Sequence, residues 1–298
     1  MRTERLPFAL LDVFTSTPLD GNGLAVVQEA DGLDERTMLR FAKEMRLSET
    51  TFVQPATVEG ADYRNRIWTI REEIPFAGHP SLGTAVAVAL RRRDSQASYV
   101  QQSGAGLQPI EVEVTRDGAR ASMLQSPATF GHELDRDAVM AALGLTSDDG
   151  DPGLPPQIAS TGLPLLIAPV VGERAVGRAS LDYPAIAKLL PADVHVFYVV
   201  ARTGHERAHA RMLSPFVTYG EDPATGSAAG PLCAYLAQRV GWRRIEIAQG
   251  VEMGRPSRLF ASMEAAGIRV AGDVVLVAEG TVMLSAAEPG ASTSRNKA

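Results

Sequence analysis

Two short segments of this chain share one design, a glycine-containing turn that runs directly into a helix of small residues. The segments are Pro75–Ala85 and Glu221–Gly230, and their glycines Gly78 and Gly226 lie about half of the 298-residue chain apart. A helix with so little polar surface must be buried. The sequence therefore predicts an α+β fold in which a strand-rich shell surrounds a central helix, built twice along the chain.

The start of each such helix is a candidate anion site, because the first N–H groups of a helix lack partners and carry partial positive charge. Two of these tips brought face to face would form a small, dry pocket for a carboxylate. Polar side chains near the two turns are Glu49, His79, Asp222 and Ser227. Two carboxylates, an imidazole and a hydroxyl are the groups that general acid–base proton transfer requires.

Each of these residues also has an ordinary structural explanation when taken alone. Glu49 fits a surface salt bridge, which is the commoner interpretation of a glutamate in such a local sequence. His79 fits a helix N-terminal residue equally well, and Asp222 before a proline fits a turn. No single residue among them establishes an active site.

Composition excludes several classes of function. A net charge of −6 and a pI near 5.5 argue against nucleic acid or an anionic membrane as a partner. The single cysteine, Cys233, allows no intramolecular disulfide and suits a reducing compartment. With no recognisable signal peptide and no apolar run of membrane-spanning length, we expect a soluble cytoplasmic protein.

The segment His205–His209 matches the HExxH pattern of zinc proteases, which requires both histidines on one face of a helix. Here the flanking segments favour strands, and in a strand residues four apart lie too far from each other to share one ion. We therefore expect no metal site.

Periodicity and turn residues give the remaining layout. Strands are predicted at Ala9–Phe14, Leu24–Gln28, Thr50–Val53, Tyr63–Thr69, Val100–Gln101, Ile110–Thr115, Ala119–Leu124, Leu165–Pro169, Val194–Ala201, Ala208–Leu213, Arg243–Ile247 and Ile268–Leu284. Helices are predicted at Asp34–Arg46, Pro80–Arg91, Arg136–Leu143, Pro184–Leu190 and Ser227–Val240. We expect an N-terminal half over residues 1–125, a C-terminal half over residues 126–285 and a disordered tail over residues 286–298. The strand near residues 281–285 is a candidate to cross back and complete the first half.

As a whole the chain resembles the PhzF family of phenazine-biosynthesis isomerases. The resemblance rests on segments spread over nearly the full length, namely Asp12–Phe14, Gly21–Val27, Leu47–Phe52, Pro75–Ala85, Glu221–Pro231 and Gln249–Ser257. It departs from the family at Gly23, where proline is usual, and at the unusually charged Ile70–Glu73, which could alter the pocket rim. The resemblance implies the diaminopimelate-epimerase fold, with two pseudo-symmetric halves, each a β-barrel around a central helix, and the active site between them.

The resemblance also implies roles for individual residues. Glu49 would carry the catalytic proton, His79, Asp222 and Ser227 would bind and polarise the substrate, and the Gly78 and Gly226 turns would hold its carboxylate. Ala77 and Thr225 align with the two cysteines of racemases that share the fold and would contact the substrate. Because those thiols are missing here, a two-thiol racemase is excluded. The family further implies no metal or organic cofactor and a homodimer.

The expected function is isomerisation of a small cyclic amino- or hydroxy-carboxylate, similar to that of trans-2,3-dihydro-3-hydroxyanthranilate. Burial can raise the pKa of a glutamate enough to make it a useful base for such chemistry. Two alternatives stay open at this point. One is a two-base epimerase that uses Glu49 and Asp222 on opposite faces of the substrate. The other is a binding homologue that has lost its activity, which the presence of Glu49 disfavours because a mere binder needs no base.

Overall fold

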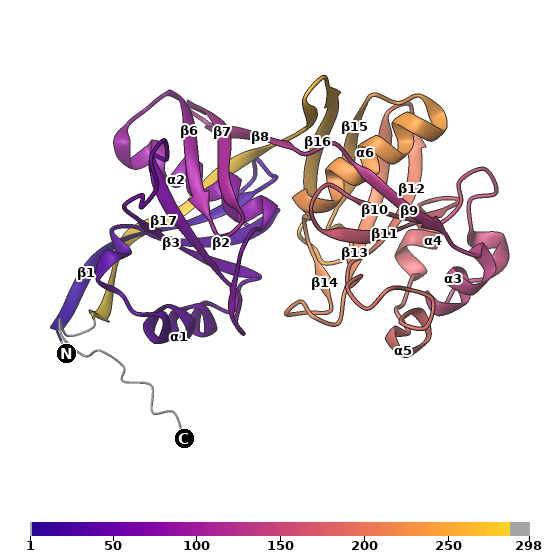
Figure 1. Ribbon diagram of the computed structural model, residues 1–298, viewed down its shortest axis with the longest axis horizontal. Helices are drawn as coiled ribbons and strands as arrows, with labels where there is room; N and C mark the ends of the chain where they lie inside the picture. Colours follow the sequence, from indigo (N-terminus) through magenta and orange to yellow (C-terminus); the bar gives the residue numbers. More distant parts are fainter. Residues whose placement is uncertain (1, 287–298) are drawn as a thin grey trace.

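The computed structural model of the protein describes residues 2–286, which form two lobes side by side (Figure 1). The tail expected over residues 286–298 lies outside the described residues, apart from Ala286 at the end of the last strand. Each lobe contains one long helix, α2 (Gly78–Arg92) or α6 (Gly226–Val240), among its strands.

The first lobe is a closed barrel of eight strands around α2. Its order is β17–β1–β2–β3–β4–β6–β7–β8 and back to β17. These strands are β1 (Arg2–Val13), β2 (Asn22–Val27), β3 (Glu49–Gln54), β4 (Tyr63–Trp68), β6 (Gln96–Ser103), β7 (Gly106–Thr115), β8 (Gly118–Gln125) and β17 (Gly267–Ala286). The short β5 (Glu73–Ile74) pairs with β4, and η1 (Ala30–Gly32) and α1 (Glu35–Met45) lie between β2 and β3.

The second lobe follows the order β9–β10–β11–β12–β13–β15–β16–β17. Its strands are β9 (Thr129–Glu133), β10 (Gln157–Ser160), β11 (Pro164–Val170), β12 (Phe197–Gly204), β13 (Arg207–Leu213), β15 (Arg244–Gln249) and β16 (Ser257–Glu264), with the two-residue β14 (Glu221–Asp222) on β13. Its small helices are α3 (Arg136–Ala142), η2 (Ser147–Asp149), α4 (Glu173–Arg178) and α5 (Tyr183–Ile186).

One unit recurs in both lobes and carries the two glycine turns. In the first lobe β4 turns back into the two-residue β5, the chain enters α2, and β6 returns parallel to β4. In the second lobe β13, β14, α6 and β15 repeat the same order and the same pairings. The first twelve residues of α2 are buried, as is most of α6. The duplicated fold with buried small-residue helices is therefore confirmed.

Strand β17 is shared between the lobes. Its first part pairs with β16 of the second lobe and with β8, and from Val274 onward it pairs antiparallel with β1. A β-bulge between Leu10 and Leu11 adjusts the register of the β1 pairing. The boundaries at residues 125 and 285 stay predictions, because this strand belongs to both lobes.

The two long helices begin earlier than predicted, at Gly78 rather than Pro80 and at Gly226 rather than Ser227. In α2, Pro80 lies in the first turn, where its missing N–H costs nothing, so the helix can include the two residues before it. Predicted α1 is confirmed, with the Asp34 side chain accepting from the Thr37 N–H at 2.7 Å. Strands β9, β10 and β16 were not predicted.

Candidate active site

The tips of the two long helices meet where the lobes face each other. A Cβ atom placed on Gly78 would lie only 3.1 Å from both the Gly226 Cα and the Ser227 nitrogen. The Gln125 amide also donates to the Gly226 carbonyl at 2.9 Å and ties this tip to the first lobe. The two tips are therefore in close approach, and their binding of a substrate carboxylate stays a prediction.

The residues just before the two helices differ in chemistry although they are equivalent in position. Ala77 is the N-cap of α2 and has no side-chain group to offer. Thr225 is the N-cap of α6, but its hydroxyl donates to Asp222 Oδ2 at 2.6 Å instead of capping the helix. Thr225 thus joins an extended polar network, whereas Ala77 has no polar side-chain atom to contribute.

Glu49 and His79 come together from neighbouring elements of the first lobe. Glu49 begins β3, beside β2, and His79 is the second residue of α2. The His79 Nε2 and Glu49 Oε2 atoms lie 3.3 Å apart. Both atoms are buried, and neither forms a hydrogen bond with other described residues. The Glu49 side chain as a whole keeps 16% of its exposure, so one part of it remains reachable.

Asn22 connects the two lobes at this point. Its Nδ2 atom lies 2.8 Å from Asp222 Oδ1, 3.1 Å from the Ala224 carbonyl and 3.1 Å from His79 Nδ1. A carbonyl and a carboxylate only accept, so this Asn22 atom is the NH2 group. His79 Nδ1 then faces a donor and acts as an acceptor, which places the imidazole proton on Nε2, toward Glu49.

Asp222 is held by donors from both lobes. Besides Asn22 and Thr225, the Ser48 hydroxyl donates to Asp222 Oδ1 at 3.2 Å. Gln249 supports the same loop by donating to the Asp222 carbonyl at 2.8 Å and to the Thr225 hydroxyl at 3.0 Å. This carboxylate is therefore fixed in one orientation.

Burial shifts the titration of all three central groups. It raises the pKa of Glu49 to about 8, and the charge of Asp222 adds to this increase. It raises the pKa of Asp222 to about 6, opposed by the hydrogen bonds from Thr225, Asn22 and Ser48. Burial also lowers the pKa of His79 to about 3. At neutral pH, Asp222 is therefore ionised, His79 is neutral and Glu49 is mostly protonated.

The structure brings the sequence-derived candidates into one region, and their roles stay predictions. Ser227 is the second residue of α6 and is half-buried beside the contact of the two tips. Sequence reasoning gave no role to Asn22, Gln249 or Ser48. The signal for all three was their place in the segments that carry the family resemblance.

The HExxH segment lies in a β-hairpin, as its flanks predicted. His205 and Glu206 occupy the turn between β12 and β13, and His209 lies within β13. Within residues 2–286, no group of three or more His, Cys, Asp or Glu side chains is arranged to hold a metal ion. No helix in this same part of the chain combines the length and apolar character needed to cross a membrane.

The chain is similar to known proteins over most of its length. A family model described as phenazine biosynthesis-like protein matches residues 11–280. The chain is 36% identical to trans-2,3-dihydro-3-hydroxyanthranilate isomerase of Pseudomonas aeruginosa, over 93% of this chain and 99% of that protein. It is similar to the solved structure of a predicted epimerase from the same organism, with 34% identity and a TM-score of 0.79 over 93% of this chain and 99% of the other.

A more distant likeness concerns the fold alone. A hydroxyproline epimerase from Agrobacterium vitis superimposes with a TM-score of 0.64 at 14% identity, covering 97% of this chain and 94% of that one. The predicted epimerase-like fold of two pseudo-symmetric halves is thereby confirmed.

Proposed function

The chain belongs to the PhzF family and is an isomerase, and on this premise we propose that it moves a proton between two carbons of a small cyclic amino- or hydroxy-carboxylate. The substrate class is the one represented by trans-2,3-dihydro-3-hydroxyanthranilate, the substrate named for its relatives. Glu49 serves as the proton carrier. His79, Asp222 and Ser227 bind and polarise the substrate.

The observation that carries this proposal is the contact between the buried Glu49 Oε2 and His79 Nε2 atoms. An ordinary glutamate, with a pKa of 4.5, is too weak a base for a carbon acid, whereas burial raises the pKa of Glu49 to about 8. The ionised Glu49 takes a proton from one carbon, and the electron pair left behind enters the conjugated system. Glu49 then returns the proton to another carbon, so the double bond moves and no oxidant or reductant is needed.

Asp222 suits a binding role in this scheme. Its Oδ1 atom accepts from Asn22 and Ser48, whereas its Oδ2 atom accepts only from Thr225 among the described residues. Each carboxylate oxygen has two acceptor positions, so one position on Oδ2 is left for an N–H or O–H group of the substrate. The N–H groups at the tips that begin with Gly78 and Gly226 supply donors for the substrate carboxylate.

Proton NMR in D2O tests the proposal with trans-2,3-dihydro-3-hydroxyanthranilate as substrate. We expect the double bond to move and the product to carry less than one deuterium per turnover, because the same carboxyl group removes and returns the proton. Full activity after treatment with a metal chelator is expected as well. Absence of turnover at any pH between 6 and 9 would refute this substrate assignment.

A two-base epimerase is the second candidate, favoured by the protonation states of the two carboxyl groups. Asp222 is ionised at neutral pH, so it could act as a base, while the protonated Glu49 could act as an acid. The same NMR experiment separates the two functions. Inversion at one carbon, with the double bond unmoved and one solvent deuteron incorporated, would favour the epimerase.

We also propose that the protein works as a homodimer in the cytoplasm and without an organic cofactor. Membership of the family supports this assembly. Light scattering of the purified protein at micromolar concentration is expected to give twice the 31.7 kDa mass of the chain. A monomer that keeps full activity would contradict this part of the proposal.

A further inference from the structure

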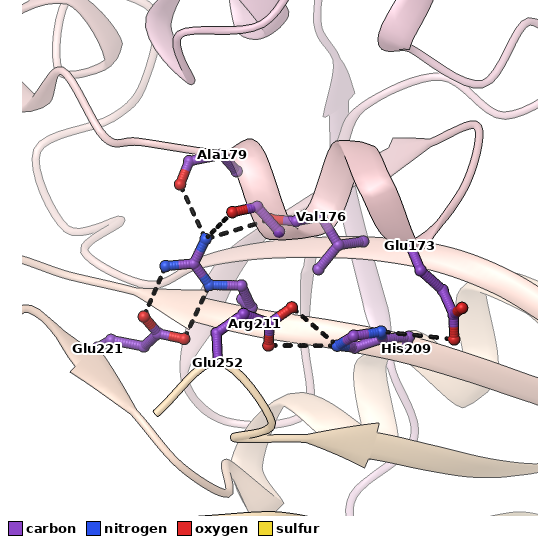
Figure 2. A network of polar contacts seen from close by, with 8 residues as sticks. Glu173, Val176, Ala179, His209, Arg211, Glu221 and Glu252 are labelled. Carbon is purple, nitrogen blue, oxygen red and sulfur yellow. Dashed lines mark hydrogen bonds and ion pairs between the residues drawn. The ribbon is translucent and has the colours of Figure 1, made fainter. Parts of the chain in front are cut away.

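Arg211 lies at the centre of a buried polar network on β13 (Figure 2). Its Nε and Nη2 atoms donate to the two carboxylate oxygens of Glu221 at 2.9 and 2.7 Å, which makes a two-pronged ion pair. Its Nη1 atom donates to the carbonyls of Val176, Gly177 and Ala179 at 3.2, 3.3 and 2.9 Å, where α4 ends. The Arg211 and Glu221 side chains keep only 12% and 13% of their exposure.

The same strand also holds the other end of α4. His209 lies two residues before Arg211, and residues two apart in a strand share a face. Its Nδ1 atom is 3.6 Å from Glu173, the first residue of α4, and its Nε2 atom contacts Glu252 at 3.2 Å (Figure 2). Because α4 is attached at both ends, the carbonyls that accept from Arg211 are fixed relative to β13.

Glu221 connects this network to the candidate active site, since the next residue is Asp222. These two residues are the whole of β14, which pairs with β13 only through Met212↔Asp222 and Leu213↔Glu221. Successive side chains of a strand point to opposite faces. The Glu221 side chain therefore pairs with Arg211 on one face of β14, while the Asp222 side chain accepts its hydrogen bonds on the other.

We propose that Arg211 is a positioning residue that, with Glu221 as its partner, fixes β14 and thereby the place and charge of the Asp222 carboxylate. The hydrogen bonds to Asp222 orient its carboxylate. The two-pronged ion pair adds a constraint on the strand that carries this residue, because a strand of two residues has few backbone hydrogen bonds of its own. The kinetic part of this inference rests on the proposed function, whereas its electrostatic part does not.

The electrostatic part follows from the charges that surround Asp222. Glu221 raises the pKa of Asp222, and Arg211 is the cation that compensates Glu221. The titratable groups that face Asp222 from the other elements are Glu49 of β3, His79 of α2 through Asn22, and Tyr198 of β12. Removing the Arg211 charge should move the pKa of Asp222 up, and removing the Glu221 charge should move it down.

The test compares Arg211→Gln, Glu221→Gln and the double variant with the wild-type protein. The pKa of Asp222 is measured by 13C NMR of protein labelled at aspartate carboxyl carbons, and its signal is identified by its loss in Asp222→Asn. We expect opposite pKa shifts in the single variants and a value near wild type in the double variant. A residue with a merely structural role would not give shifts of opposite sign.

Kinetics test the positioning part. We expect Arg211→Gln to lower kcat/KM by about tenfold to a hundredfold, mainly through kcat, because small displacements of a binding group weaken catalysis strongly. Arg211→Lys keeps the charge but loses the two-pronged geometry, so it should leave the pKa of Asp222 near wild type and still lower kcat. The matched control is Arg269→Gln, which removes a similar two-pronged ion pair with Glu264 outside the site.

The outcomes separate this inference from the proposed function. Shifts of the same sign, or no shift, in the two single variants would overturn the inference, as would full kcat/KM in both Arg211 variants. If Arg211→Gln fails to fold, Glu221→Gln and Arg211→Lys decide by the same readouts. The NMR titration needs no substrate, so opposite shifts in a protein that does not isomerise the substrate would refute only the proposed function.

Discussion

Glu49 and Asp222 are two buried carboxyl groups in one site, contributed by opposite lobes, and their surroundings differ. Asp222 accepts hydrogen bonds from Asn22, Ser48 and Thr225, whereas one oxygen of Glu49 has none and faces His79 at 3.3 Å. Both lose water on burial, yet the pKa of Asp222 rises to about 6 and that of Glu49 to about 8. The hydrogen bonds to Asp222 oppose the effect of burial on its pKa, whereas the charge of Asp222 adds to the effect of burial on the pKa of Glu49.

This difference assigns the two carboxyl groups to different work. A group with several fixed donors is suited to stay ionised and to bind, because protonation would cost it those hydrogen bonds. A group without donors can gain and lose a proton with little rearrangement, which a proton carrier must do. The site thus combines a carboxyl group without protein donors among the described residues, from β3 of the first lobe, with a hydrogen-bonded one from β14 of the second.

Neutralising each carboxyl group in turn is the strongest test of these two roles. We expect Glu49→Gln to lower kcat by about a thousandfold and Asp222→Asn by about tenfold to a hundredfold, because only the first removes the proton carrier. Glu44→Gln, on the exposed face of α1, is the matched control and should keep full activity. Equal losses in the two site variants would mean that both groups transfer protons.

The pH dependence of kcat/KM tests whether Glu49 acts as the base and whether its pKa depends on Asp222. Glu49 has to be ionised to act as a base, so activity should rise about tenfold per pH unit below its pKa of about 8 and level off above it. The charge of Asp222 contributes to that raised pKa. In Asp222→Asn, the pH at which kcat/KM levels off, seen as a bend in the profile, should therefore be lower. A bend that stays in place would show that the two groups are not coupled.

Disturbing the contact between the helix tips is expected to have the smallest effect of the three changes. Gly78→Ala would place a methyl group 3.1 Å from the Gly226 Cα and should lower the free energy of unfolding by about 1–3 kcal/mol. Gly204→Ala is the control, because a Cβ at Gly204 meets no described atom within 4 Å. Chemical denaturation of both variants measures the difference. A Gly78→Ala protein as stable as the control would show that the tips can separate freely.

The sequence predicted the central helices and the membership of the site, but not how its groups are held. A helix of small residues with little polar surface has to be buried, so α2 and α6 could be predicted from composition and turns. The family resemblance then placed Glu49, His79, Asp222 and Ser227 in one site. These predictions depend on local patterns and on motifs.

The supporting contacts could not be predicted, because each joins residues that the fold alone brings together. Asn22 lies in a turn-like Gly-Asn-Gly segment, and only the pairing of the lobes shows that it reaches Asp222, 200 residues away. Arg211 and Glu221 are close in sequence, but an arginine on a strand has many possible partners. Their pairing depends on the short β14 folding back onto β13, which no periodicity indicates.

The strand that both lobes share also dictates an order of assembly. During synthesis, residues 2–125 emerge first, yet the barrel they form needs β17 to close between β1 and β8. Until residues 267–286 have left the ribosome, those two strands present open edges that could pair with another nascent chain. The first lobe to be translated can therefore close its barrel only after nearly the whole chain has been made.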